Sequence, residues 1–268
     1  MIRQIELLWP FGRPALEYVE THLTDHCNMN CRRCSHFSPL SEPQFADLEV
    51  FRRGMTNLAR LFRTIRIIRL LGGEPLLNKD VVAFMQCARE TFPKARIRLV
   101  TNGILLEKMS DTFWDACRRN RVEIQMTVYA PMEEKVDRYA TLCRQNGVKL
   151  AIVRSERFCV WLNGAGDSPK EESFRRCRRW LYCPLLKDGR LYVCATSAYI
   201  GIFNRRFRRD IPESEGLTLG KDGMTGKRVL KWLDSSLETC RWCAMEKSEA
   251  EWNNRGEAEA CDWFSQKK

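Results

Sequence analysis

Three cysteines within eight positions, Cys27, Cys31 and Cys34, are the residues of this sequence best suited to chemistry. They have Cys-x3-Cys-x2-Cys spacing and follow a strand-like run, YVETHLT, at residues 18–24. A tight loop of this kind can direct three thiolates at one metal centre and leaves a four-ligand site one ligand short. Structural metal sites are closed, whereas catalytic sites keep a position open. The spacing therefore predicts a reactive centre.

A glycine-rich turn, Gly72-Gly73-Glu74-Pro75, directly follows the next apolar run, IRIIRLL. Two glycines permit positive φ angles or a close approach of backbone, and the glutamate adds an acceptor. A second turn, Thr101-Asn102-Gly103, follows the third predicted strand. If the strands are parallel, both turns lie at the edge of the sheet that carries the cysteine loop.

The cysteine spacing and the GGEP turn together resemble the signature of radical S-adenosylmethionine (SAM) enzymes. The resemblance implies that Cys27, Cys31 and Cys34 hold a 4Fe–4S cluster whose fourth iron is chelated by SAM. It also implies a set of SAM-binding residues in the two turns: Gly72, Gly73, Glu74, Pro75 and Asn102. The sequence departs from the family at Arg33, where an aromatic residue usually lies near the adenine.

Two further SAM contacts follow from position in the expected barrel. Thr127 is near the end of the fourth predicted strand and could reach the ribose or carboxylate. Arg154 ends the fifth strand and could clamp the SAM carboxylate through two hydrogen bonds. No general acid or base is assigned, although Tyr129, Glu156 and Asp167 are expected near the mouth of the barrel.

Histidines beside the loop offer an alternative metal site. With three cysteines, His26 or His36 would complete a Cys3His zinc centre. Such a centre leaves the GGEP turn unexplained, so we expect both histidines to pack around the loop. We expect other cysteines to be core residues, because they lie in helix-like or strand-like runs: Cys87, Cys117, Cys143 and Cys159.

Strand-like and helix-like segments alternate over the first part of the chain. Helical spacing is predicted for residues 47–62, 79–90, 108–120 and 133–146, with Gly147 as a C-cap. Strands are predicted at 18–24, 65–71, 95–100, 122–129, 149–153 and 158–162. This order predicts an α/β fold with parallel strands, specifically a partial (β/α)6 barrel.

A second group of cysteines lies beyond a linker-like stretch at residues 164–172. The candidate metal ligands there are Cys177, Cys183, Cys194, Cys240 and Cys243, and Cys261 stands apart. The segment 183–194 reads as a hairpin with an Asp188-Gly189 turn, which places Cys183 opposite Cys194. The pattern Cys177-x11-Gly189-x4-Cys194 with Cys240-x2-Cys243 resembles the "twitch" variant of the SPASM extension, which implies one auxiliary 4Fe–4S cluster. The pattern favours Cys177 as a ligand and the hairpin favours Cys183.

We therefore expect two domains, a radical SAM barrel in residues 1–172 and a small cysteine-rich α+β twitch-like domain in residues 173–268. Residues 1–14 have no apolar core long enough for a signal peptide, and no run approaches a membrane span. Thirteen cysteines, an odd number, fit a reducing cytoplasm better than a disulfide framework.

The net charge is +11, with arginine runs at 175–179 and 205–209. The charge fits either a phosphate-bearing ligand or a solvated basic face, and no recognisable nucleic-acid module accompanies it.

The resemblance implies hydrogen-atom abstraction by a 5′-deoxyadenosyl radical. The expected substrate is a small sugar, cyclitol or nucleotide-linked molecule that is oxidised, epimerised or dehydrated.

The alternative is modification of a peptide, including a ribosomal peptide, and a non-catalytic metalloprotein is a more distant third. The expected partner protein is an electron donor such as flavodoxin or ferredoxin, and no membrane partner is expected.

Overall fold

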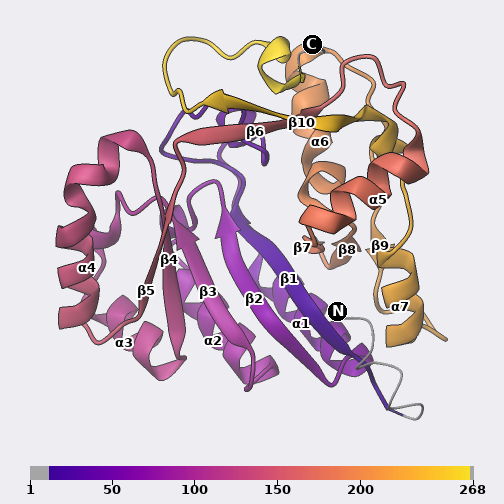
Figure 1. Cartoon of the computed structure of the whole chain (residues 1–268). Helices are drawn as coiled ribbons and strands as arrows, with labels where there is room; N and C mark the ends of the chain where they lie inside the picture. Colours follow the sequence, from indigo (N-terminus) through magenta and orange to yellow (C-terminus); the bar gives the residue numbers. More distant parts are fainter. Residues whose placement is uncertain (1–11, 266–268) are drawn as a thin grey trace.

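A sheet of parallel strands with helices on one side forms the first part of the chain (Figure 1). The computed structural model describes residues 12–265, so most of the segment 1–14 lies outside the described residues. The parallel strands are β1 (Ala15–Thr24), β2 (Thr64–Gly72), β3 (Arg96–Thr101), β4 (Val122–Val128) and β5 (Leu150–Arg154). The helices between them are α1 (Leu48–Leu61), α2 (Val81–Thr91), α3 (Asp111–Arg119) and α4 (Val136–Gln145). The predicted α/β fold is confirmed.

The helices begin and end where their sequences specify. The Asp47 side chain accepts a hydrogen bond from Val50 N and caps α1. Gly147, with φ of 64°, follows α4 as predicted. Short 3-10 helices connect several elements: Ser38–Leu40, Pro75–Leu77, Leu106–Lys108, Ala130–Lys135, Glu238–Trp242 and Ala260–Trp263.

The two faces of the parallel sheet differ in chemistry because side chains alternate along a strand. One set of alternate positions packs with the helices in the main core, including Leu70, Leu99 and Ile124, all fully buried. The other set makes polar contacts between strands, as when Arg69 donates to the Tyr18 hydroxyl at 3.0 Å. The sheet therefore has an apolar face toward the helices and a polar face toward the barrel interior.

The C-terminal part extends this sheet on the far side of β1. Strand β7 (Leu185–Lys187) pairs with β1 in parallel, and β8 (Arg190–Tyr192) and β9 (Leu217–Thr218) follow antiparallel. Helices α5 (Lys170–Trp180), α6 (Ala195–Phe207) and α7 (Gly226–Leu233) lie in this part. The full order is β5-β4-β3-β2-β1-β7-β8-β9. The proposed boundary at residue 172 thus falls between segments that share one sheet.

The prediction of a sixth parallel strand was wrong. Strand β6 (Arg157–Leu162) pairs antiparallel with β10 (Cys243–Glu251) in a separate two-stranded sheet, seen at the top of Figure 1. Only Ser155 and Glu156 separate β5 from β6. Two residues cannot form the crossover that a parallel pair requires. Strand β5 is therefore an edge of the larger sheet.

The hairpin prediction was right in its register. Lys187 pairs with Arg190 across the turn, and Leu185 with Tyr192. Asp188 and Gly189 both have positive φ, 50° and 73°, as a type I′ turn requires. Among residues 12–265, no helix is long and apolar enough to span a membrane.

Candidate functional site

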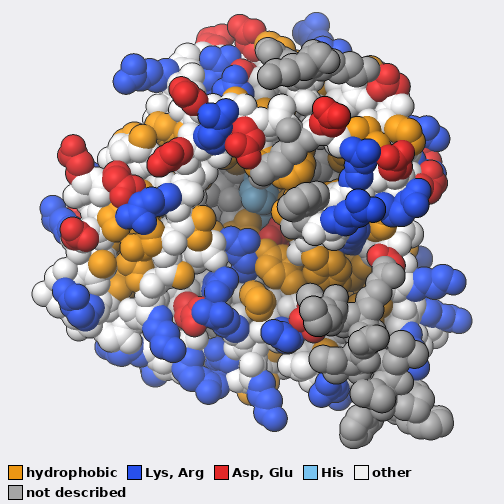
Figure 2. All heavy atoms as spheres, in the orientation of Figure 1, with side chains coloured by type: hydrophobic (Ala, Val, Ile, Leu, Met, Phe, Trp, Pro, Cys, Tyr) orange, Lys and Arg blue, Asp and Glu red, His pale blue; other side chains and the backbone are white. Residues whose placement is uncertain are grey.

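The three clustered cysteines line one cavity at the carboxyl end of the parallel strands. Their loop leaves β1, and the cavity has a volume of about 190 Å³. Other lining residues come from the turns after β2 and β3 and from β4, among them Gly72, Gly73, Asn102 and Thr127. The face of the molecule drawn in Figure 2 is hollowed near its centre, and a histidine side chain is visible in the hollow. The structure thus brings most of the predicted SAM-binding residues to the cysteines.

The glycine turn is packed directly on the backbone of the cysteine loop. A Cβ atom on Gly73 would lie 2.0 Å from the His26 carbonyl oxygen, and Gly72 has a φ of 147°. Gly73 N donates to Thr24 O at 2.8 Å, and Glu74 N donates to His26 O at 3.0 Å. Only glycine permits this approach. The two glycines therefore fix the position of the cysteine loop as well as lining the cavity.

Glu74 is fully buried and ties the strand-end turns together. Its carboxylate accepts hydrogen bonds from Thr101 Oγ1 at 2.7 Å, Asn102 N at 2.9 Å and Leu76 N at 3.1 Å. Burial raises the pKa of Glu74 to about 7 despite these donors. Pro75 is buried beside it. Both residues were predicted to bind SAM, and in the structure they stand behind the cavity wall rather than in it.

The remaining predicted SAM contacts occupy different surroundings. Asn102 lies next to the cysteine loop, where its Nδ2 donates to Asn28 Oδ1 at 2.7 Å and is 3.8 Å from Cys27 Sγ. Thr127 lines the cavity. Arg154 ends β5 and its Nε donates to Glu133 Oε1 at 2.9 Å, with the guanidinium about half exposed. Arg154 would have to leave this ion pair to reach a ligand in the cavity.

The three thiols differ in acidity because their surroundings differ. Burial raises the pKa of Cys27 to about 12 and that of Cys31 to about 11. Burial also acts on Cys34, but its hydrogen bond to His36 holds the pKa of that thiol below its ordinary value. Burial alone would lower the pKa of His36, yet its bonds to Cys34 and Glu20 raise it to about 9. Cationic iron would supply the charge that Cys27 and Cys31 need to ionise.

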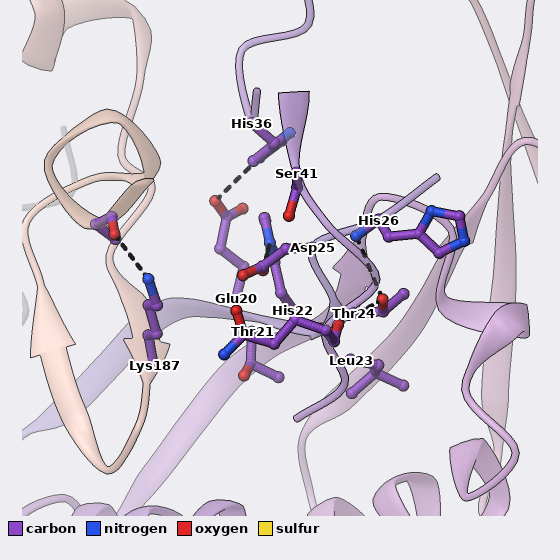
Figure 3. A network of polar contacts seen from close by, with 12 residues as sticks. Glu20, Thr21, His22, Leu23, Thr24, Asp25, His26, His36, Ser41 and Lys187 are labelled. Atoms are coloured by element: carbon purple, nitrogen blue, oxygen red, sulfur yellow. Dashed lines mark hydrogen bonds and ion pairs between the residues drawn. The ribbon is translucent and has the colours of Figure 1, made fainter. Parts of the chain in front are cut away.

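His36 connects the cysteine loop to a polar network on β1 (Figure 3). Its Nε2 lies 3.9 Å from Glu20 Oε1, and Glu20 accepts from the Tyr18 hydroxyl. The hydroxyl in turn accepts from Arg69, whose Nε is buried without a hydrogen-bond partner. The hydroxyl of Ser38, 4% exposed, is likewise without a partner. Arg69, Ser38 and His36 all line the cavity.

A second buried pair lies beside this network. His22 Nδ1 is 2.9 Å from Asp25 Oδ1, and the His22 ring stacks on Tyr199 at 4.0 Å between centroids. Burial lowers the pKa of His22 to about 4, so the imidazole is neutral and this is a hydrogen bond rather than an ion pair. The Lys187 ammonium lies 4.3 Å above the Tyr199 ring. These residues join β1 to β7 and α6.

The end of the chain crosses the cysteine loop. We call residues 252–263 the C-terminal strap. Trp252 Nε1 donates to Cys31 Sγ at 3.2 Å, and Trp263 Nε1 donates to the Cys34 carbonyl at 2.9 Å. Arg32 forms an ion pair with Asp262 at 2.7 Å. Sequence reasoning missed the strap because isolated tryptophans in a polar segment carry no periodic signal.

The five candidate cysteines of the C-terminal part also converge. Cys177 comes from α5, Cys183 precedes β7 and Cys194 caps α6. Cys240 lies in the 3-10 helix Glu238–Trp242, and Cys243 begins β10. Burial raises the pKa of Cys243 well above its ordinary value, and the other four thiols add to that rise. Burial likewise raises the pKa of Cys177 to about 11, with Cys194 and Cys240 contributing. These thiols are close enough to interact electrostatically and could share one centre.

The cysteines outside the two groups lie in the core, beside a smaller cavity or at the surface. Cys87, Cys117 and Cys143 are core residues with at most 2% exposure. Cys159 in β6 is partly buried and lines a smaller cavity, which Arg33 of the cysteine loop and the adjacent Ser35 also line. Cys261 is exposed. Of the three residues expected at the barrel mouth, Tyr129 lines the main cavity and Glu156 and Asp167 do not.

The arginine runs lie on α5 and at the end of α6, and no residue of either run lines the main cavity. Arg176 donates to the Met245 carbonyl and Arg178 to the Leu233 carbonyl. These two side chains therefore bind backbone carbonyls of β10 and of the end of α7.

The zinc alternative finds no support in the described residues. No group of three or more His, Cys, Asp or Glu side chains in residues 12–265 is arranged to hold one metal ion. His26 and His36 point in different directions (Figure 3). A cubane cluster spreads its thiolate ligands over separate corners, farther apart than the ligands of one ion. The cavity-lining thiols and the close-packed glycine turn fit that larger group and an open ligand position.

Comparison with known families agrees with this geometry. Residues 21–151 match the radical SAM superfamily. This segment runs from β1 into β5 and includes the cysteine loop, the GGEP turn and Asn102. This match identifies a radical SAM domain in residues 21–151, just under half of the chain. The cofactors of this superfamily are SAM and a 4Fe–4S cluster.

Among curated relatives, the GTP 3′,8-cyclase of Aliarcobacter butzleri is 26% identical over 185 residues, covering 63% of this chain and 53% of the relative. The GTP 3′,8-cyclase of Geobacter sulfurreducens is 32% identical over 108 residues, covering 40% of this chain and 32% of the relative. The chain spans about half or less of the length of these relatives in the matched regions.

Among solved structures, BtrN in complex with AdoMet and 2-DOIA matches with a TM-score of 0.50 and 16% identity. The match covers 85% of this chain and 92% of BtrN. At this identity the likeness concerns the fold, and it extends over the barrel and the C-terminal part.

Proposed function

We propose that this protein cleaves SAM reductively and uses the resulting radical to remove a hydrogen atom from a small polar substrate. Cys27, Cys31 and Cys34 would hold the cluster, since all three thiols line one cavity that remains open to ligands. When bound, the reduced cluster and SAM supply one electron and a 5′-deoxyadenosyl group, which yields methionine and the radical. The protein contributes binding, orientation and electrostatics.

Residues of the strand-end turns would bind SAM. Gly72, Gly73 and Asn102 lie beside the cysteine loop, so their backbone and amide groups are placed for the amino-acid part of SAM. Thr127 lines the same cavity and would contact the ribose or carboxylate. Glu74 and Pro75 would act indirectly by holding these turns in place. Arg154 would contribute after exchanging Glu133 for the SAM carboxylate.

The substrate class rests on one observation, the unpartnered donors at the cavity wall. Arg69 Nε and Ser38 Oγ are buried without hydrogen-bond partners, and both residues line the cavity beside His36. Buried polar groups are nearly always satisfied, so each missing partner is a candidate ligand atom. A guanidinium edge and a hydroxyl suit an oxygen-rich acceptor such as a phosphate, hydroxyl or carbonyl group.

These donors support a sugar, cyclitol or nucleotide-linked substrate that is oxidised, epimerised or dehydrated. The relatives named GTP 3′,8-cyclase act on a nucleotide, which is consistent with this class.

An auxiliary 4Fe–4S cluster is the second part of the proposal. We assign its ligands to Cys177, Cys194, Cys240 and Cys243, whose thiols interact with one another in every pairing. This set follows the twitch pattern and leaves Cys183 beside Glu20 and Cys194 as a fifth, non-ligating thiol. The cluster would accept an electron from the substrate radical or bind the substrate.

The proposed function also implies that the protein works in the cytoplasm and receives electrons from a donor such as flavodoxin or ferredoxin. The thirteen cysteines of the chain are all unpaired thiols in the structure, which suits a reducing compartment. A net charge of +11 favours an acidic donor protein.

The test is SAM cleavage with and without candidate substrates after anaerobic reconstitution. We would measure 5′-deoxyadenosine with GTP, other nucleotides, sugar phosphates and cyclitols, and follow deuterium transfer from labelled substrate. Substrate-dependent formation that weakens in Arg69→Gln and recovers in Arg69→Lys would support the proposed class. Deuterium transfer only from peptides would replace it with peptide modification, and no cleavage under any condition would favour a non-catalytic metalloprotein.

A further inference from the structure

A hydrogen bond from the C-terminal strap reaches a sulfur of the cysteine loop. Trp252 Nε1 lies 3.2 Å from Cys31 Sγ. The indole N–H is a donor only, so in this bond the sulfur is the acceptor. Cys31 is 6% exposed, which keeps water from competing for the sulfur. Trp252 lies more than two hundred residues from Cys31 in the sequence, just beyond the end of β10.

The orientation of the indole ring is fixed from several sides. Trp252 N donates to the Glu156 carbonyl at 2.8 Å, which anchors the backbone. The ring stacks on Tyr129 with a centroid distance of 5.6 Å and an interplanar angle of 25°. Tyr129 stacks in turn on Phe158 at 5.9 Å and 9°. An aromatic stack thus aims the N–H at the sulfur.

The strap also holds the cysteine loop against the indole. Arg32 N donates to the Asn253 carbonyl at 2.8 Å, so the residue after Cys31 is bonded to the residue after Trp252. The Arg32–Asp262 ion pair and the Trp263 bond to the Cys34 carbonyl continue this attachment. Donor and acceptor are therefore parts of one fixed arrangement.

We infer that Trp252 is a positioning residue that raises the reduction potential of the SAM-binding cluster through its hydrogen bond to Cys31. The inference rests on the proposed function, in which Cys31 is a cluster ligand. Hydrogen bonds to ligating sulfurs are among the factors that set iron–sulfur potentials. Reduction adds one electron to the cluster and increases the negative charge on its sulfurs. The indole N–H bonds more strongly to that state, so the bond favours the reduced cluster.

The test is a redox titration of the reconstituted holoenzyme, monitored by electron paramagnetic resonance. Trp252→Phe keeps an aromatic ring on Tyr129 but removes the N–H. We expect its SAM-responsive cluster signal to have a more negative midpoint potential than wild type. Trp263→Phe is the matched control, since it removes an indole N–H from the same strap that bonds a carbonyl rather than a sulfur. We expect no shift in its midpoint.

One further variant separates loss of iron from loss of the hydrogen bond. If Trp252→Phe loses iron, 3-benzothienylalanine placed at position 252 preserves the bicyclic shape without the N–H and replaces it in the titration. An unchanged or more positive midpoint in the variant that binds iron fully would overturn the inference. Absence of any SAM-responsive signal in wild type would instead overturn the proposed function.

Discussion

The two groups of cysteines differ in how the chain assembles them. The first group lies in one loop, lines an open cavity and has three thiols. The second group has five thiols, which come from α5, the residues before β7, the N-cap of α6, a 3-10 helix and the first residue of β10. An open site with a missing ligand suits catalysis, and a site closed by protein thiols suits electron transfer or structure. Under the proposed function, this difference would assign catalysis to the first group and electron transfer or a structural role to the second.

The groups also differ in their local charge. His36 stabilises a thiolate at Cys34, and the pKa of His36 is raised to about 9 by the same contact and by Glu20. In the second group, burial dominates and raises the pKa of Cys177, Cys183, Cys240 and Cys243. The contact with His36 thus favours ionisation of one ligand of the first site, whereas burial opposes ionisation of the thiols in the second.

The largest expected effect comes from removing a ligand of the first group. Cys31→Ala should reduce 5′-deoxyadenosine formation to background and lower the iron content by about four per chain. Chromatographic product analysis and iron determination measure both. Cys261→Ala, an exposed cysteine outside either group, is the control and should match wild type. Normal cleavage by Cys31→Ala would show that the roles of the two groups are misassigned.

Removing a ligand of the second group should separate the two centres. Cys243→Ala should lose about four irons but keep SAM cleavage, because the first cavity is intact. Cys183→Ala should keep the full iron content, since Cys183 is the fifth thiol of the group. Iron and sulfide analysis distinguishes the two variants. Iron loss in Cys183→Ala with full iron in Cys177→Ala would exchange the assignments of these two residues.

Adding a methyl group at the glycine turn should disrupt the first cysteine site although no cysteine is substituted. In Gly73→Ala the new Cβ would meet the His26 carbonyl at 2.0 Å, which forces the cysteine loop away from the turn. We expect the free energy of unfolding to fall by at least about 2 kcal/mol, together with loss of the first cluster. Urea denaturation and iron analysis test this. Gly220→Ala, where the nearest atom is the Asn57 side chain at 3.3 Å, should change little.

The last expected effect is a pH dependence that originates at Glu74 and needs no bound cluster. Burial raises its pKa from 4.5 to about 7, so the stability contributed by its protonated form is complete below about pH 4.5 and is lost as the pH rises through about 7. The full shift corresponds to roughly 3 kcal/mol. Glu74→Gln removes this titration but replaces one of the two oxygens that accept from Thr101 and Asn102 with an NH2 group, which cannot accept.

The destabilisation of Glu74→Gln relative to wild type should therefore shrink between pH 5 and pH 8. Urea denaturation of the metal-free proteins at the two values measures it. A difference that is constant with pH would show that Glu74 does not titrate in this range.

Local signals in the sequence predicted most of the barrel. The β/α alternation up to Arg154 depends on periodicity and caps, and the β7–β8 register depends on the Asp188-Gly189 turn. Strand β6 was recognised as a strand but misplaced in the sheet. Its partner β10 begins at Cys243, about eighty residues later, and no local pattern specifies that pairing.

The candidate site likewise has parts that local motifs predicted and parts that depend on tertiary contacts. Clustered cysteines and glycines are visible as motifs, so the loop and turn were predicted from spacing. The unpartnered donor of Arg69 and the bond from Trp252 depend on tertiary contacts between distant segments. Glu74 was found by its motif, but its burial behind the cavity could be known only from the structure.

The most direct test of the two-centre account is the metal content of the anaerobically reconstituted protein, measured together with SAM cleavage. The account predicts about eight irons and eight sulfides per chain and formation of 5′-deoxyadenosine under reducing conditions. About four irons would remove the auxiliary cluster. Zinc without iron, and no 5′-deoxyadenosine, would contradict the account as a whole.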